Sequence, residues 1–529
     1  MTKQTDLHKI FARYFKGVES LAYALSKKLS EGNICLDIND YCNELPELHT
    51  QQRASDSFRE EDAVFWSDPA SFARQCHEGQ YVTHSETGVK PFVVQNGRAY
   101  LHRYYQYETR IIDNIHRLGD HFRIITGGPG TGKTHGVATI LANLYGADRH
   151  LKVALAAPTG KAAARMNEAI MRFAANDSNG LDTPTREWLS GLQAQTLHRL
   201  LGYIPDSVFF RYNDTNRLPY DIVIVDECSM VDVALMAKLL EAVDSQSRLF
   251  LLGDKDQLAS VEAGSVFGDL CRAADSPLLR GKVEIKTKSW RFDPDKGIGR
   301  FSADVIAGKP PGTDTYTNDA QIRIEHGFPE ELIREFALLY GEYIGEDDIK
   351  TALQKLNLVR FLCVTRENEW SVSDVNQRIQ KILAKEIPGF QPRTSGFYHN
   401  QPIIVTQNDY NLMVFNGDVG LIRKEGETFY AWFEGIHGEV RKVQAGYLNH
   451  YETVFAMTIH KSQGSEFDNV VVILPESQGE KLLTRELLYT AVTRAKSRVL
   501  LLTTSESLDT CVERAVSRAS GIEKRLKNA

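Results

Sequence analysis

The sequence predicts an α/β protein made of two successive units in which buried parallel strands alternate with helices. A glycine-rich loop, GGPGTGKT, lies between a short apolar run and a helix-forming stretch at residues 122–141. Apolar runs then follow at residues 153–156 (VALA), 222–225 (IVIV) and 249–252 (LFLL). Continuous apolar runs of this kind are typical of parallel strands that are buried on both faces. A second alternation begins near residue 358 with LVRFLCVT and continues with VVVIL and VLLL.

Length and composition set the broad class. A chain of 529 residues is too long for a single core, so several domains are expected. The hydrophobic content of 42% and the charged content of 25% are ordinary for a globular protein. No stretch approaches the roughly 18 apolar residues of a membrane span, and the N-terminus lacks a basic-then-apolar signal pattern. These observations predict a cytoplasmic protein without a membrane partner.

Cysteine spacing and net charge exclude some function classes. The seven cysteines are scattered without a C-x-x-C pair, which argues against a disulfide framework, a zinc site and an iron–sulfur cluster. We expect reduced and mostly buried thiols. The net charge of −7 argues against a generally basic surface. Nucleic acid, if bound, would therefore lie in a local channel.

Residues 1–105 carry no catalytic pattern. Apolar residues at helical spacing predict one amphipathic helix over residues 11–29. Acidic and turn-forming residues follow, so we interpret this part as a small helical domain. A docking module is the sharper alternative.

The glycine-rich loop has the full spacing G-x-x-x-x-G-K-[ST] of a nucleoside-triphosphate site. Its glycines let backbone N–H groups point towards an anion, and the helix N-terminus adds partial positive charge. We expect Lys133 to reach the β- and γ-phosphates and the Thr134 hydroxyl to bind Mg²⁺. A chance glycine turn is the alternative, which the flanking strand and helix disfavour. The predicted phosphate-binding residues are Gly127, Gly128, Pro129, Gly130, Thr131, Gly132, Lys133 and Thr134.

An acidic pair ends the apolar run at residues 222–225. Ligands of open parallel sheets bind at the carboxyl ends of the strands. We therefore expect Asp226 to hold Mg²⁺ through its water shell and Glu227 to polarise the attacking water. Gln257 follows the run at residues 249–252. It is interpreted either as a hydrogen-bond partner of the γ-phosphate or as a satisfied loop amide.

Two arginines are expected to complete this site from the second unit. Arg291 lies in KSWRF and Arg494 lies in YTAVTRA. An arginine that reaches the phosphates from another domain is worth about 10³–10⁵ in rate. A third arginine, Arg485, is interpreted as a surface or structural residue. The predicted catalytic residues are Lys133, Glu227, Gln257, Arg291 and Arg494.

Three further stretches combine hydroxyls with close backbone approach, which suits nucleic-acid phosphates. They are APTGKAAARM, QTLHRL and MTIHKSQGSEF. For QTLHRL, a helix-capping threonine with a packed histidine is the alternative. Glu466, in the last stretch, is assigned to the nucleotide site. The predicted nucleic-acid-binding residues are Thr159, Gly160, Thr196, His198, Thr458, His460 and Lys461.

Two insertions are predicted from turn residues. Short strand-like runs (PIIVT, VGLIRK and TFYAWF) separated by turns predict a small barrel at residues 402–448 within the second unit. The turn-forming NDTN predicts a projecting hairpin near residues 204–220 of the first unit.

Taken in order, these stretches resemble the motifs of superfamily 1 helicases over about residues 123–502. GGPGTGKT is similar to motif I, APTGKAAARM to motif Ia, QTLHRLLG to motif Ib and VDECSM to motif II. GDKDQLASV is similar to motif III, SWRF to motif IV, TIHKSQGSEF to motif V and YTAVTRAK to motif VI. The forms GD-x-x-QL and T-x-HKSQG-x-E resemble those of the 5′-to-3′ branch.

Within that branch the chain resembles the RecD family, the alpha subunits of exodeoxyribonuclease V. The phrases AAPTGKAAAR, TLHRLLG, GDKDQLASVEAGSVFGD, FNGDVG, HKSQGSEFD and TRELLYTAVTRA carry this resemblance, and so does LAYALSKKLSEGNICLDI near the N-terminus. It implies an ATP- and Mg²⁺-dependent 5′-to-3′ helicase on single-stranded DNA, acting in double-strand break repair with RecB-like beta and RecC-like gamma subunits. The family places the nuclease on the beta subunit. A standalone helicase of this branch and an ATPase switch subunit without unwinding activity are the alternatives.

The resemblance also implies a domain layout. RecA-like domains are expected at residues 106–290 and at 291–399 with 450–529, and an SH3-like insert at 400–449. A helical domain at 1–105 is expected to dock on the gamma subunit. The chain departs from the superfamily pattern before motif I, where a glutamine commonly reads adenine. The comparable position falls near Arg110, and Gln106 is the nearest glutamine.

Overall fold

The computed structural model describes residues 6–53, 60–85, 87–312, 316, 319–393, 395–409, 411–435, 439–475 and 482–528. Within these ranges no helix combines the length and the apolar character needed to cross a bilayer. The seven cysteines are free, and six of them are buried.

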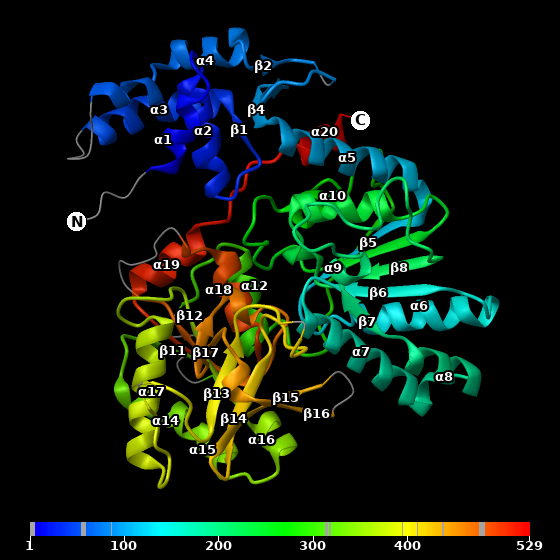
Figure 1. The fold of residues 1–529 in the computed structure, drawn as a ribbon, viewed down its shortest axis with the longest axis vertical. Helices are drawn as coiled ribbons and strands as arrows, with labels where there is room; N and C mark the ends of the chain where they lie inside the picture. The colour runs from blue at the N-terminus through cyan, green and yellow to red at the C-terminus, as the bar shows by residue number, and fades with distance from the viewer. Residues whose placement is uncertain are drawn as a thin grey trace.

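A six-stranded parallel sheet forms the first unit, in the order β10-β5-β9-β8-β6-β7 (Figure 1). Val223 and Val225 of β8 pack in a core with helices α5 and α10, and Ile222 and Ile224 pack in a second core with α6 and α7. This two-sided burial explains the continuous apolar runs, and the strands predicted at 153–156, 222–225 and 249–252 are confirmed. The elements are α5 His102–Leu118, β5 Phe122–Gly127, α6 Lys133–Ala147, β6 Val153–Ala157, α7 Gly160–Ala175, α8 Thr183–Gly191, β7 Ala194–Thr196, α9 Leu197–Leu200, β8 Ile222–Val225, α10 Val233–Ala242, β9 Arg248–Gly253, α11 Val266–Arg272 and β10 Val283–Lys286.

A five-stranded parallel sheet forms the second unit, in the order β11-β20-β19-β12-β18. Alternate residues of β19 again join opposite cores: Val470 and Val472 pack with α12 and α18, and Val471 and Ile473 pack with α14 and α17. The elements are α12 Gly297–Ile306, β11 Ile322–His326, α14 Glu330–Ala337, α15 Gly341–Ile344, α16 Ile349–Lys355, β12 Val359–Cys363, α17 Val372–Glu386, β18 Ala456–Thr458, β19 Phe467–Ile473, α18 Arg485–Val492, β20 Ala495–Thr503 and α19 Ser505–Glu513.

An antiparallel sheet is inserted between α17 and β18, in the order β16-β15-β14-β13-β17. Its strands are β13 Gln401–Val405, β14 Val419–Glu425, β15 Thr428–Glu434, β16 Val440–Gln444 and β17 Tyr451–Thr453. The three strand-like runs expected in this part of the chain correspond to β13, β14 and β15.

The N-terminal part differs from the helical domain that the sequence predicts. It contains a four-stranded sheet, β1-β4-β3-β2, packed against four helices. The single helix expected over residues 11–29 is two helices, because Gly17 adopts a φ of +88° between them. The expected boundary at residue 105 falls inside α5. The elements are α1 Leu7–Arg13, α2 Glu19–Ser30, β1 Cys35–Asp37, α3 Ile38–Arg53, α4 Pro69–Glu78, β2 Val82–Thr83, β3 Phe92–Gln95 and β4 Arg98–Leu101.

Two further parts of the chain differ from the expected layout. The hairpin near residues 204–220 is a loop with one antiparallel bridge, between Tyr203 and Phe210, and this described segment forms no strand. The C-terminal part of 450–529 does not stay with the second unit. Helix α20 (Ile522–Lys527) lies beside α5, and its Ile522 and Leu526 join the core of the first unit (Figure 1).

Candidate active site

The glycine-rich loop connects β5 to α6 and touches the second unit. Gly130 and Gly132 adopt φ angles of +74° and +75°, a region that favours glycine. A Cβ on Gly130 would lie 2.4 Å from the Cβ of Arg291, so the close approach of the two segments also requires glycine. Lys133 Nζ donates hydrogen bonds to the carbonyl oxygens of Gly127 and Gly128, which keeps its ammonium within the loop.

The predicted magnesium-binding residues lie next to each other. Thr134 Oγ1 donates to Asp226 Oδ2 at 3.3 Å, and Asp226 Oδ1 accepts from the Glu227 backbone N–H at 2.8 Å. Burial and the neighbouring Asp226 raise the pKa of Glu227, while Arg494 and Lys133 favour its charged form. A carboxylate with a raised pKa is a better proton acceptor, as a general base requires.

A cleft of about 570 Å³ brings together the catalytic residues that the sequence predicts from both units. Lys133, Glu227 and Gln257 line it from the first unit, and Arg291 and Arg494 line it from the second. Cations facing such a cleft favour a polyphosphate. The lining also includes residues 129–132 and Thr134, Asp226, Arg165, Glu466 and Lys496.

A three-residue ion cluster crosses the cleft. Glu466 Oε1 accepts from Arg291 Nη2 at 2.8 Å, and Glu466 Oε2 pairs with Arg165 Nη2 at 3.0 Å. Burial alone would raise the pKa of Glu466, but Arg165 and Arg291 outweigh it, and the pKa lies below its usual value. Sequence reasoning missed Arg165. Its position one turn after Ala162 on α7, a helix that begins at the carboxyl end of β6, could have indicated it.

Gln257 is only partly satisfied by the protein. Its Nε2 donates to Asp254 Oδ2 at 3.0 Å, whereas its buried Oε1 has no partner among the described residues. Next to it, Leu258 N donates to Thr490 Oγ1 at 2.9 Å. Gln463 Nε2 donates to the Leu258 carbonyl at 2.8 Å. This loop of the first unit therefore bonds directly to the second.

Arg494 is oriented by backbone carbonyls of its own unit. Its Nε donates to the Thr490 carbonyl at 3.1 Å and its Nη1 to the Ser465 carbonyl at 3.4 Å. Burial lowers its pKa, and the charge of Glu227 acts in the opposite direction. Arg485 is not among the residues that line this cleft. Its Nη2 donates to the Glu513 carbonyl at 2.8 Å, which is a structural contact.

Two of the stretches predicted to bind nucleic acid meet across the two units. A Cβ on Gly464 would lie 3.5 Å from the Ala162 Cβ and 3.8 Å from Thr159 Oγ1. Thr159 also caps α7, accepting from Ala162 N at 3.2 Å. Lys461 pairs with Glu452 at 2.9 Å, and burial lowers the pKa of His460.

The third stretch shows the capping arrangement. Thr196 Oγ1 accepts from Arg199 N at 3.3 Å. The His198 ring packs edge-on against Tyr203 and Phe210. Thr196 therefore caps α9 and His198 packs on a loop.

The glutamine nearest to the position that commonly reads adenine in the superfamily is not in the cleft. Gln106 lies on α5, within 3.5 Å of His102 Nε2, and is not among the residues that line the cleft. Trp290 is 77% exposed, and a Cβ on Gly132 would lie 3.9 Å from its indole. Sequence reasoning gave this indole no role. Its position directly before Arg291 in KSWRF could have indicated that the indole lies near the nucleotide site.

Comparisons with known proteins show the family of the chain. Residues 112–263 match the AAA domain model, and residues 453–502 match the UvrD-like helicase C-terminal domain. Residues 15–100 match the N-terminal domain of RecBCD enzyme subunit RecD. RecBCD enzyme subunit RecD of Mycolicibacterium smegmatis is 42% identical over 424 residues, 78% of this chain and 74% of the relative. The chain belongs to the RecD family.

Other relatives of this RecD-family chain are more distant. RecBCD enzyme subunit RecD of Haemophilus influenzae is 34% identical, over 77% of this chain and 70% of the relative. The ATP-dependent RecD2 DNA helicase of Deinococcus radiodurans is 32% identical, over 74% of this chain and 48% of the relative. Among solved structures, Candida albicans Pif1 helicase is 16% identical with a TM-score of 0.40, covering 80% of this chain and 98% of that chain.

Proposed function

We propose that this RecD-family chain is an ATP-dependent DNA helicase that moves 5′ to 3′ on single-stranded DNA. The observation that carries the proposal is the shared cleft, which Lys133 and Glu227 line from the first unit and Arg291 and Arg494 from the second. A hydrolysis site divided between two units couples nucleotide turnover to their relative movement. In this proposal the parallel sheets are RecA-like domains and the inserted antiparallel sheet is an SH3-like domain.

The chain's residues have defined parts in the proposed reaction. Lys133 and the loop N–H groups bind the phosphates, and Glu227 accepts a proton from the attacking water. The Gln257 Nε2 group carries two hydrogens; one is donated to Asp254, and in this proposal the other is donated to the γ-phosphate. Its unpartnered Oε1 accepts a hydrogen bond from the attacking water. Arg291 and Arg494 stabilise negative charge that develops during transfer.

Magnesium fits the same cleft. The Thr134 hydroxyl and the Asp226 carboxylate lie 3.3 Å apart beside the phosphate-binding loop, and hard oxygen donors suit Mg²⁺. When bound, the ion would neutralise phosphate charge. The protein's contribution is to orient these two oxygens.

DNA binding is proposed on both units. Thr159 and Gly160 would bind the backbone beside Thr458, His460 and Lys461, because Thr159 lies next to Gly464 across the unit boundary. Thr196 and His198 would extend this track, in addition to their capping and packing contacts. Movement of the units would then shift one set of contacts relative to the other.

The proposed partners are RecB-like beta and RecC-like gamma subunits. The N-terminal domain is the proposed docking module, and the proposed location is cytoplasmic. The second candidate is a helicase that acts alone, favoured by the likeness to RecD2. Co-expression with both partner subunits, followed by size-exclusion chromatography, separates them. A heterotrimer supports the first candidate, and an isolated chain that unwinds DNA supports the second.

The motor itself is tested with Lys133→Gln and Glu227→Gln. Lys133→Gln should lose ATP binding and translocation. Glu227→Gln should bind ATP but hydrolyse it about 10²–10⁴-fold more slowly, the usual worth of a general base. Lys152→Gln, an exposed lysine of the same unit, is the matched control. Translocation by Lys133→Gln at the unmodified rate would contradict the motor and leave an ATPase switch.

A further inference from the structure

The C-terminal segment, residues 514–528, links all three parts of the protein. Val516 N donates to Glu486 Oε2 of the second unit at 2.9 Å. Further along, Ala519 N donates to Asn33 Oδ1 of the N-terminal domain at 2.8 Å. Gly521 N then donates to Glu108 Oε1 on α5 at 2.7 Å. The segment therefore fastens the N-terminal domain to both units.

Arg518, in the middle of this segment, binds a loop of the first unit. Its Nη1 donates to the carbonyl oxygens of Ser260 at 2.6 Å, Glu262 at 2.9 Å and Gly264 at 3.0 Å. Three carbonyl oxygens thus converge on one charged nitrogen, and hydrogen bonds to charged groups are the stronger ones.

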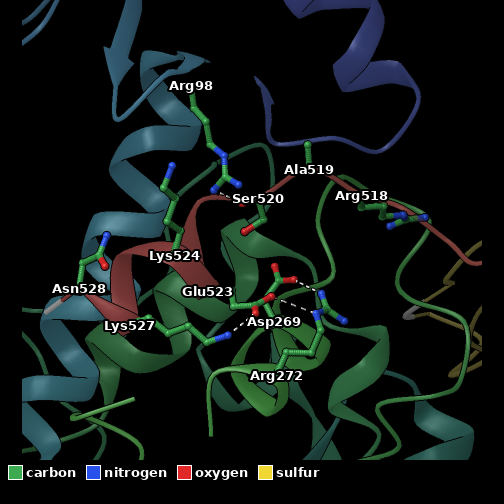
Figure 2. A pocket seen from close by; sticks show the side chains of 10 residues that line it. All are labelled: Arg98, Asp269, Arg272, Arg518, Ala519, Ser520, Glu523, Lys524, Lys527 and Asn528. Atoms are coloured by element: carbon green, nitrogen blue, oxygen red, sulfur yellow. Dashed lines mark hydrogen bonds and ion pairs between the residues drawn. The ribbon is translucent and has the colours of Figure 1, made fainter. Parts of the chain in front are cut away.

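Two other cations near this segment, Lys527 within it and Arg272 on α11, pair with carboxylates instead. Lys527 and Arg272 pair with Glu523, and Arg272 also pairs with Asp269. Figure 2 shows Arg518 pointing away from this acidic cluster. The contacts of Arg518 are to backbone carbonyls, so they depend on the backbone conformation of the loop and stabilise that conformation.

The loop that Arg518 binds begins at the cleft. Gln257 lines the cleft, and Leu258 bonds to Thr490 of the second unit. At the other end, Gly264 N donates to the Gly32 carbonyl of the N-terminal domain at 2.9 Å. Only a few residues therefore separate the cleft from a contact with the N-terminal domain.

The loop 260–264, the N-terminal domain and Arg518 are closely packed where they meet. A Cβ on Gly264 would lie 2.7 Å from Ile34 Cδ1, and a Cβ on Gly32 would lie 3.0 Å from Arg518 Nε. Both glycines have positive φ angles, +100° and +88°. Only residues without a Cβ fit this close packing comfortably.

We propose that Arg518 is a positioning residue for ATP hydrolysis, because it holds the loop 260–264 so that Gln257 stays oriented in the cleft. Through the same loop, the rate of turnover depends on the position of the N-terminal domain. The inference rests on the proposed function of the cleft. Because the loop contacts Gly32 directly, a partner that binds the N-terminal domain would alter turnover through this junction.

The test uses Arg518→Ala in the full chain. We expect kcat for DNA-stimulated ATP hydrolysis to fall about tenfold and KM for ATP to change less than about twofold, since a lost charge-assisted contact is worth that much in rate. Amide hydrogen exchange should become faster at residues 258–264 and 31–36. Arg518→Lys should recover part of kcat, and added guanidinium ion should partly restore kcat in Arg518→Ala. Lys527→Ala, a cation of the same segment, should behave as the unmodified chain.

Several outcomes would overturn the inference. Turnover of Arg518→Ala within about twofold of the unmodified chain, with faster exchange at residues 258–264, would show that the loop does not position Gln257. If Arg518→Ala does not fold, the same measurements are made on Arg518→Lys. A tenfold rise in KM for ATP with unchanged kcat in Arg518→Lys would contradict the proposal. Failure of the proposed function would appear separately, as absent DNA-stimulated turnover in the unmodified chain, while hydrogen exchange still reports whether Arg518 holds the loop.

Discussion

Tyr489 donates a hydrogen bond from its hydroxyl to Asp254 Oδ2 at 2.9 Å, across the boundary between the two units. Asp254 follows β9 of the first sheet, and Tyr489 lies on α18 of the second unit. A Cβ on Gly128 would lie 2.8 Å from the same hydroxyl. Burial, followed by the charge of Asp254, raises the pKa of Tyr489, so the phenol stays protonated as a donor. The Tyr489 side chain of the second unit thus contacts both the phosphate-binding loop and Asp254, the residue that accepts a hydrogen bond from Gln257.

Tyr489→Phe should weaken this connection without changing side-chain volume much. The contact should lose about 1.5–3 kcal/mol, the worth of a hydrogen bond to a charged group. We expect kcat for ATP to fall about tenfold, because Asp254 also accepts from Gln257 and a shift of 1.36 kcal/mol in the barrier is tenfold in rate. Steady-state ATPase assays with single-stranded DNA measure this. Tyr447→Phe, at a tyrosine that is 63% exposed, is the control. Equal kcat in the two variants would show that the Tyr489–Asp254 contact does not support hydrolysis.

Arg494→Ala should remove charge stabilisation from the second unit. We expect kcat to fall about 10³-fold with little change in the ATP dissociation constant, because such an arginine acts mainly on the transition state. Arg494→Lys should not restore kcat, since an ammonium lacks the planar fork. Arg323→Ala, whose side chain is 54% exposed on β11, is the control. A large loss of ATP affinity with unchanged kcat would assign Arg494 to ground-state binding instead.

Trp290→Ala should raise KM for ATP by about tenfold while kcat changes little, because stacking on a base is worth about 1–3 kcal/mol. The indole is exposed beside Gly132, and Lys288 Nζ lies 4.3 Å from its ring centroid. Trp290→Phe should retain most of the affinity. Titration of nucleotide should also change the indole fluorescence of the unmodified chain, and Trp290→Phe should lose that change. A KM for Trp290→Ala equal to that of the unmodified chain would exclude base stacking at this position.

Asp269 should make stability depend on pH. Burial raises its pKa to about 7, although Arg272 favours the charged carboxylate. The folded chain therefore holds a proton that the unfolded chain releases near its ordinary value of about 4, so stability falls as pH rises from about 4 to 7.

Asp269→Asn removes this titration. Its Tm relative to the unmodified chain should rise between pH 5 and pH 8, as measured by thermal unfolding at several pH values. Asp177→Asn, whose side chain is 90% exposed, should follow the unmodified chain. A Tm difference for Asp269→Asn that does not vary with pH would contradict a raised pKa at Asp269.

Sequence patterns predicted the inner strands of both parallel sheets, β5, β6, β8 and β9 in the first and β12, β19 and β20 in the second, but not the edge strands β10, β7, β11 and β18. The apolar runs at 222–225 and 249–252 predicted strands because their side chains are buried on both faces. The spacing of Lys133 and Thr134 after the glycines predicted the phosphate-binding loop, because close phosphate approach restricts the residue types that fit. For Gln257, the pattern alone left a satisfied loop amide as the alternative to a contact with the γ-phosphate.

Only the tertiary structure decided how distant segments meet. Arg165, Glu466 and Arg291 form one cluster because α7 and the second unit approach each other, and that approach has no period in the sequence. The path of residues 514–528 back to the N-terminal domain is set by contacts such as Ala519 with Asn33, which lie 486 residues apart along the chain. Local pattern reflects which face of an element is buried, whereas long-range contacts depend on the packing of whole units. The loop from Gln257 to Gly264 therefore became a link between the cleft and the N-terminal domain only in the folded chain.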